Sequence, residues 1–245
     1  MLKSLLIACS FISIIPVPRK ICLEWTPGNL RLFPVMLALI GALIFVPIWA
    51  GIFIFLREFV NFSVNLRGLV MTLSALALTG GLHMDGLMDT SDAIFSHRDR
   101  ETRLKILSDT HAGSFAVIAC VSVILLKTLL FAEIFTRSDI NLLKISLIPA
   151  LSRLGMSILL NNSRFAKKNG LAVILGSSRN QRDNFILAII YIIYASCDIF
   201  SGLILALSLF IWHKICAKIF GGITGDLLGA FVEISEIILL FRAAC

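Results

Sequence analysis

The order of apolar and polar residues is the most informative feature of this sequence. Nearly uncharged runs occur at residues 33–56, 69–82, 112–135, 142–160, 184–212 and 219–241. Most of them approach the roughly 20 residues that an α-helix needs to cross a bilayer, whereas strands of a membrane barrel would alternate apolar and polar positions. The pattern therefore predicts an all-α fold, a polytopic integral membrane bundle of about six or seven transmembrane helices.

Two segments depart from a simple series of spans. The run 184–212 is longer than one span and too short for two, so we expect Asp198, Ser201 and Gly202 to break it into a re-entrant hairpin or two short helices. Residues 1–18 predict an amphipathic N-terminal segment that stops at the Pro-Val-Pro sequence 16–18. The sequence has no Gly-, Ser- or Pro-rich linker and no internal repeat, which predicts one membrane-embedded domain over residues 1–245.

Composition supports a membrane protein and excludes an ordinary soluble domain. Of the 245 residues, 58% are hydrophobic and only 15% are charged, and the mean hydropathy is +0.94. The net charge of +7 does not indicate a nucleic-acid partner, because the lysines and arginines fall mainly between the apolar runs. Lysines and arginines cluster in two connections, 98–105 and 164–182, so the positive-inside rule predicts that both are cytoplasmic.

A first acidic motif, GGLHMDGLMDTSD, occupies residues 80–92. If the helix that begins near residue 69 continues through it, Asp85, Asp89 and Asp92 share one face at i, i+4 and i+7. Neighbouring carboxylates repel one another unless a cation lies between them, and oxygen-only ligands favour Mg²⁺, Mn²⁺ or Ca²⁺. The motif thus predicts a metal site that also takes phosphate. The alternative is that the aspartates cap and solvate a helix end.

A second acidic motif, GGITGDLLGAFVEISE, occupies residues 221–236. It places Asp226, Glu233 and Glu236 at i, i+7 and i+10, with Gly222 and Gly229 near the same face. Each ionisable group near the bilayer centre costs about 2.5–3.5 kcal/mol, so these carboxylates must avoid lipid. Because glycine permits close helix approach, we expect the second acidic face to meet the first and to share its cations.

Cationic residues near these motifs are candidates for phosphate binding. Arg103 lies in the basic connection, and arginine donates two hydrogen bonds at once to a phosphate. That connection could equally serve only to orient the protein. Arg153 lies inside an apolar run, where it either faces a substrate cavity or pairs with a carboxylate. His83 and His111 are single histidines, which are more often structural.

Four stretches carry a resemblance to a known family. TGGLHMDGLMDTSDAIF at 79–95, RLKILSDTHAGSF at 103–115, PALSR at 149–153 and the second acidic motif resemble the cobalamin synthases, also called adenosylcobinamide-GDP ribazoletransferases. The opening FISIIPVP at 11–18 is also similar. Two departures occur, at 108–111 and at 12–15, and the first leaves His111 without an inherited role.

The resemblance implies a Mg²⁺-dependent transfer between substituted phosphate groups, late in cobalamin biosynthesis. Adenosylcobinamide-GDP and α-ribazole, or α-ribazole 5′-phosphate, would give adenosylcobalamin or its 5′-phosphate and GMP. It implies a multi-pass protein of the bacterial inner membrane whose active site faces the cytoplasm, and it leaves a homo-oligomer open. The candidate residues are Asp85, Asp89, Asp92 and Asp226 for catalysis; the same four with Glu233 and Glu236 for the metal; and Arg103, Arg153, Asp109 and His83 for substrate phosphate.

An ion-coupled transporter is the alternative function, because transporters also retain intramembrane carboxylates as a proton or cation relay. Such a protein would place these groups at mid-depth on discontinuous helices. Here Asp85, Asp89 and Asp92 instead precede a basic connection at the expected cytoplasmic edge. A non-catalytic membrane scaffold would not account for two clustered acidic faces.

Overall fold

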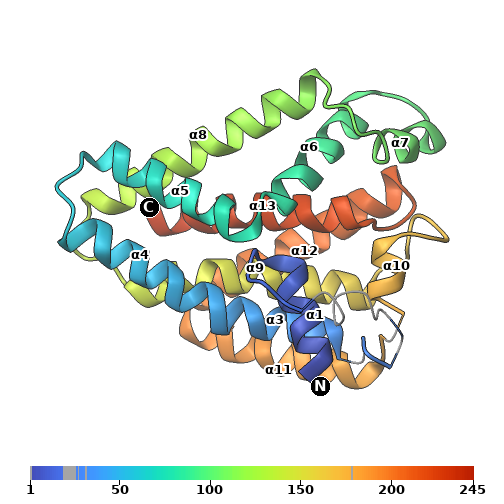
Figure 1. The fold of residues 1–245 in the computed structure, drawn as a ribbon, viewed down its shortest axis with the longest axis horizontal. Helices are drawn as coiled ribbons and strands as arrows, with labels where there is room; N and C mark the ends of the chain where they lie inside the picture. The colour runs from blue at the N-terminus through green and yellow to red at the C-terminus, as the bar shows by residue number, and fades with distance from the viewer. Residues whose placement is uncertain (1, 19–25, 27, 31, 178) are drawn as a thin grey trace.

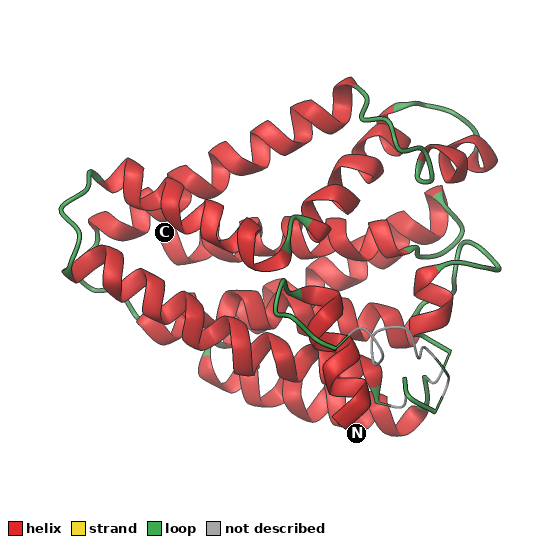
Figure 2. Cartoon of the chain, viewed as in Figure 1, coloured by secondary structure: helices red, strands yellow, loops and turns green. Residues whose placement is uncertain are grey.

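The structure is a computed structural model that describes residues 2–18, 26, 28–30, 32–177 and 179–245. Helices joined by loops make up this part of the chain, and no strand occurs in it (Figure 2). The only β pairing among these residues is one isolated parallel bridge, between Phe165 and Ile223. The predicted all-α class is confirmed.

The helices follow one another with short connections (Figure 1). Their bounds are α1 Leu2–Ile12, α3 Phe33–Ile40, the π-helical turn η1 Gly41–Phe45, α4 Val46–Glu58, α5 Val64–Thr79, α6 Leu82–Phe95, α7 Arg100–Ile106, α8 Ser114–Thr136, α9 Leu142–Asn162, α10 Leu171–Leu175, α11 Gln181–Cys197, α12 Ile199–Ile219 and α13 Gly225–Ala244. The predicted N-terminal segment is therefore a helix that ends before the Pro-Val-Pro sequence.

Four helical segments of the described chain are long and apolar enough to cross a membrane: Phe33–Glu58, Ser114–Thr136, Leu142–Asn162 and Ile199–Ile219. The shorter α5 is also apolar. In Leu142–Asn162, which is α9, 78% of the apolar window is buried, against 28–33% in the other three. Thus α9 forms the centre of the bundle, and the others present apolar side chains outward, as a bilayer requires.

The long run 184–212 is broken at Asp198, as expected. Asp198 adopts an extended backbone between α11 and α12, and its Oδ2 accepts a hydrogen bond from Ser201 Oγ at 2.8 Å. The Tyr191 hydroxyl donates to the Gly202 carbonyl at 2.8 Å. The result is a hairpin of two helices, of which α12 alone is long enough to span.

The first acidic motif does not continue the preceding helix, so that expectation is wrong. Gly80 and Gly81 adopt left-handed conformations, with φ of 61° and 75°, and they end α5 and start α6. Residues with a side chain rarely adopt this conformation, which explains why two consecutive glycines mark the break. The aspartates still share one helix, α6.

Both basic connections lie at the same end of the bundle, as predicted. The segment that contains α7 and the segment that contains α10 are together on the right of Figure 1, and the α4–α5 connection is at the opposite end. Lys167 Nζ donates to Ser108 Oγ, which joins the two segments directly. The guanidinium of Arg100 lies against Gly221 in the α12–α13 turn. Three connections therefore form one polar end of the molecule.

Candidate active site

Close contact between α6 and α13 brings the two acidic motifs together. A Cβ on Gly86 would lie 2.7 Å from the Asp226 carbonyl oxygen, so only glycine fits there. A Cβ on Gly229 would lie 3.2 Å from the His83 Cα. The predicted role of Gly229 in helix approach is confirmed. Gly222, in contrast, lies against the backbone of 164–166 and has a φ of 156°, so it serves the turn before α13.

Asp85, Asp89 and Asp226 are close enough to influence one another electrostatically. Asp89 lies on α6, outside the four candidate spans. Burial, followed by the neighbouring carboxylates of Asp85 and Asp226, raises the pKa of Asp89 to about 6. Burial and like charges both disfavour the ionised form of a carboxyl group. The α6–α13 contact thus concentrates negative charge from two motifs that lie far apart in the sequence.

A cavity of about 160 Å³ opens beside these carboxylates. Its first wall contains His83, Asp85 and Gly86 from α6 and 223–226 and Gly229 from the start of α13. Its second wall contains Lys167 and the segment 169–173, with Phe11 and Met156. His83 is 1% exposed, and its Nε2 has no hydrogen-bond partner among the described residues. Asp85, Asp226 and His83, three of the predicted site residues, therefore share one cavity.

Asp92 has a structural partner that the sequence did not reveal. Its Oδ2 accepts a hydrogen bond from the Gly113 amide at 2.6 Å, and its Oδ1 accepts one from the Ala116 amide at 2.9 Å. These amides belong to the first turn of α8, whose N–H groups have no partner within the helix. Asp92 of α6 thus caps the N-terminus of α8, which agrees with the alternative that the aspartates cap a helix end. Its predicted metal-binding role stays a prediction.

Glu233 and Glu236 lie further along α13, and the structure does not bring them together with the aspartates. Lys127 Nζ of α8 lies 2.6 Å from Glu233 Oε2 and 2.6 Å from Glu236 Oε2. Arg153 of α9 forms an ion pair with Glu236 Oε1. These four side chains are 3–4% exposed. Two cations therefore already neutralise the two glutamates that the sequence assigned to the metal.

Arg153 is enclosed on all sides by protein groups. Its guanidinium donates to Glu236, to Ser152 Oγ at 3.0 Å and to the Pro149 carbonyl at 3.2 Å. Its guanidinium carbon also lies 4.2 Å from the centroid of the Phe45 ring. The structure favours the pairing alternative for Arg153 over direct contact with substrate phosphate.

Lys127 is the residue of this network that sequence reasoning missed. It lies inside a run of apolar residues on α8, and its partners are 106 and 109 residues further along the chain. A lone lysine in a membrane helix requires a partner, as does a lone arginine. The argument applied to Arg153 could therefore have identified Lys127 from the sequence.

The remaining phosphate-binding candidates lie in the connection between α6 and α8. Arg103 of α7 is partly buried, and its Nε is without a hydrogen-bond partner among the described residues. Asp109 is exposed, and its Oδ1 lies 2.7 Å from His111 Nδ1. The side-chain hydrogen bond from His111 is the main cause that lowers the pKa of Asp109. His111, which had no inherited role, thus orients Asp109.

The donor chemistry of the α6–α13 contact fits magnesium. Within the described part of the chain, no group of three or more His, Cys, Asp or Glu side chains lies close enough to hold a metal ion. Magnesium differs from metals held in all-protein cages, because it is commonly bound by one or two carboxylates, water and substrate phosphates. Asp85 and Asp226 on one cavity wall supply oxygen donors of this kind.

Comparison with known proteins agrees with the motifs. The family model of cobalamin-5-phosphate synthase matches residues 4–244. An adenosylcobinamide-GDP ribazoletransferase of Geobacillus sp. (strain WCH70) is 35% identical over 93% of this chain and 90% of its own length. An adenosylcobinamide-GDP ribazoletransferase of Escherichia coli O17:K52:H18 is 29% identical over 94% of this chain and 95% of its own length. No solved structure matches. The chain belongs to the cobalamin-5-phosphate synthase family.

Proposed function

We propose that this protein transfers the cobinamide-phosphate part of adenosylcobinamide-GDP onto α-ribazole or α-ribazole 5′-phosphate. The products are GMP and adenosylcobalamin or its 5′-phosphate. The family membership and the relatives' names support this activity. The observation that carries the proposal is the meeting of Asp85 and Asp226, from two separate motifs, on the wall of one cavity.

In this reaction an acceptor hydroxyl oxygen bonds to the phosphorus adjacent to cobinamide. The bond from that phosphorus to the oxygen of the departing GMP breaks, and the hydroxyl loses its proton. Asp85 and Asp226 would hold Mg²⁺ together with water and substrate phosphate, and the bound ion would neutralise charge on the diphosphate. The glycine contact between α6 and α13 fixes the relative position of these carboxylates, so that the chain positions the reacting groups.

The ion pairs in the bundle weaken the transporter alternative. A relay needs carboxylates that can exchange a proton or cation within the membrane. Glu233 and Glu236 are instead held by Lys127 and Arg153. Asp85 instead lines a cavity together with Lys167, a residue of the polar end where the basic connections gather. This end faces the cytoplasm of the bacterial inner membrane in our proposal, because lysine and arginine are retained on that side.

The test is GMP release by the purified protein in lipid, with adenosylcobinamide-GDP, α-ribazole and Mg²⁺. Asp85→Asn and Asp226→Asn should each lower turnover by roughly 100-fold or more, the scale for loss of charge stabilisation at a reacting centre. Asp139→Asn is the matched control, because Asp139 is exposed next to Arg137, far along the chain from both motifs. Chelation of divalent metal should stop the reaction, and added Mg²⁺ should restore it.

Near-normal turnover of both site variants would refute the assignment of the carboxylates. Unchanged activity after chelation would refute the magnesium requirement. Absence of GMP release by the unmodified protein, with both acceptors tried, would refute the proposed reaction itself.

A further inference from the structure

The cavity beside Asp85 has two chemically different walls. The α6–α13 wall carries the carboxylates, and the opposite wall is formed by Lys167, Asn169 and the apolar residues 171–173 of α10. Phe11 and Met156 extend the apolar part. A cavity with apolar walls and a few directed polar groups is typical of a site for a small organic molecule. Each wall here carries polar groups, carboxylates on the first and Lys167 with Asn169 on the second.

The size of this cavity restricts which substrate it can hold. Its volume of about 160 Å³ is below the roughly 300–1,000 Å³ of most small-molecule sites. A corrin ring with its side chains is far too large for it, so the smaller acceptor is the substrate that this partly open cavity can receive. A wider open groove, of about 820 Å³, also borders Asp85 and is lined by residues of α1, α5, α6 and α8. The larger substrate therefore has a separate place next to the same carboxylate.

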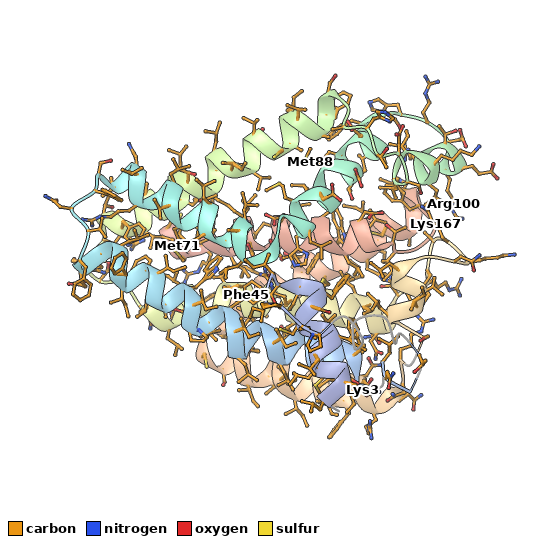
Figure 3. All side chains as sticks on the ribbon, in the orientation of Figure 1. Lys3, Phe45, Met71, Met88, Arg100 and Lys167 are labelled. Carbon is orange, nitrogen blue, oxygen red and sulfur yellow. The ribbon has the colours of Figure 1, made fainter. Side chains whose placement is uncertain are left out.

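Lys167 is the one lysine or arginine among the described residues that line the cavity. Its Nζ donates to Ser108 Oγ in an exposed hydrogen bond, which ties the ammonium group to the α7–α8 connection. Asn169 lies two residues away on the same wall. Asp85 and Asp226 would repel an anionic ligand unless a cation lay nearby, and Lys167 supplies this cation. Figure 3 shows Lys167 at the polar end of the molecule, close to Arg100.

We propose that the cavity holds the acceptor nucleotide and that Lys167 binds its 5′-phosphate; this inference rests on the proposed function. The base lies against the apolar wall formed by α10, and the ribose hydroxyl faces Asp85 and Asp226. Lys167 thereby favours α-ribazole 5′-phosphate over α-ribazole. The sequence had placed this lysine only among the charges that orient the protein.

The test compares two acceptors and two adjacent lysines. KM is measured for α-ribazole 5′-phosphate and for α-ribazole in the unmodified protein, Lys167→Ala, Lys167→Arg and Lys168→Ala. Lys168→Ala is the control: it removes the same charge from the same segment, but Lys168 is exposed and does not line the cavity. Calorimetric titration of α-ribazole 5′-phosphate without the donor gives its Kd independently of turnover.

Lys167→Ala should raise KM and Kd for the phosphorylated acceptor by roughly 10- to 100-fold, the value of a charge-assisted hydrogen bond. Its KM for α-ribazole should stay within about threefold of the unmodified protein. Lys167→Arg should recover most of the affinity, and Lys168→Ala should behave as the unmodified protein.

Equal losses with both acceptors would overturn the inference, because Lys167 would then act on the donor or on the fold. Equal effects of Lys167→Ala and Lys168→Ala would overturn it too, since they would indicate general charge alone. In both cases GMP release by the unmodified protein would leave the proposed function standing. Absence of GMP release with either acceptor would instead refute the function.

Discussion

Replacement of Lys127 by methionine should destabilise the bundle strongly. Methionine keeps a long side chain but removes the cation that Glu233 and Glu236 share. Glu236 retains Arg153 and Ser152, while Glu233 loses its ion pair with Lys127 at a position where it is 3% exposed. Removal of one member of a buried ion pair typically costs about 3–5 kcal/mol, because it leaves an uncompensated charge.

The double variant Lys127→Met/Glu233→Gln separates this explanation from a packing defect. It removes one positive and one negative charge and leaves the Arg153–Glu236 pair intact. We expect it to recover at least about 2 kcal/mol relative to Lys127→Met, since replacement of both members of a buried pair is often close to neutral. Lys144→Met is the matched control, because Lys144 is partly exposed and its Nζ lies as far as 3.9 Å from Asp198 Oδ1. A pair of this kind is worth about 0–1 kcal/mol.

The free energies are measured by reversible unfolding in mixed micelles with increasing SDS, followed by tryptophan fluorescence. Trp49 packs against Phe131 of α8 with ring centroids 5.4 Å apart, so its emission reports on the bundle that contains Lys127. A loss of under about 1 kcal/mol for Lys127→Met would refute the reasoning. A double variant less stable than Lys127→Met would refute it as well, because neutralising the second charge should relieve the defect.

Three further predictions concern the contacts around the site. Gly86→Leu should lower GMP release by roughly 10-fold or more, because a Cβ at this position would lie 2.7 Å from the Asp226 carbonyl oxygen. Gly51→Leu is the control and should keep its activity, because a Cβ there would have nothing within 4 Å. Equal activities of the two variants would contradict the helix contact. Asp92→Ala should cost about 0.5–2 kcal/mol of unfolding free energy without metal or substrate, through loss of the α8 cap, and unchanged SDS unfolding would contradict that role. Cysteines at Ser96 and Ser177 should be labelled from the same side of sealed vesicles, and opposite sides would contradict the shared polar end.

The acidic face of α6 could be predicted because spacing along one helix fixes the angle between side chains. Asp85 and Asp89 are one turn apart, so they lie on the same side of α6 wherever that helix packs. The same reasoning placed Glu233 with Asp226 on one face of α13. Those two residues are seven positions apart, however, which separates them by roughly 10 Å along the axis. Spacing predicted the direction of Glu233 and not its depth.

Depth and partners depend on which helices pack together, and a single sequence does not contain that information. At the level of Asp226, α13 faces Gly86 of α6, whereas at the level of Glu236 it faces Lys127 of α8 and Arg153 of α9. Hence one acidic face contributes to two different environments. The capping of α8 by Asp92 could not be predicted for the same reason, because it joins residues 21 and 24 positions apart across a loop.

The two left-handed glycines between α5 and α6 also set the direction in which the acidic helix leaves α5. A straight helix over residues 64–95 would be roughly 48 Å long at 1.5 Å per residue, well beyond the roughly 30 Å of the hydrocarbon layer. Such a rod would also carry α6 away from the start of α13, where Gly86 meets Asp226. Redirecting the chain at Gly80 and Gly81 instead lets α6 pack along α13, so that carboxylates from two distant motifs line one cavity.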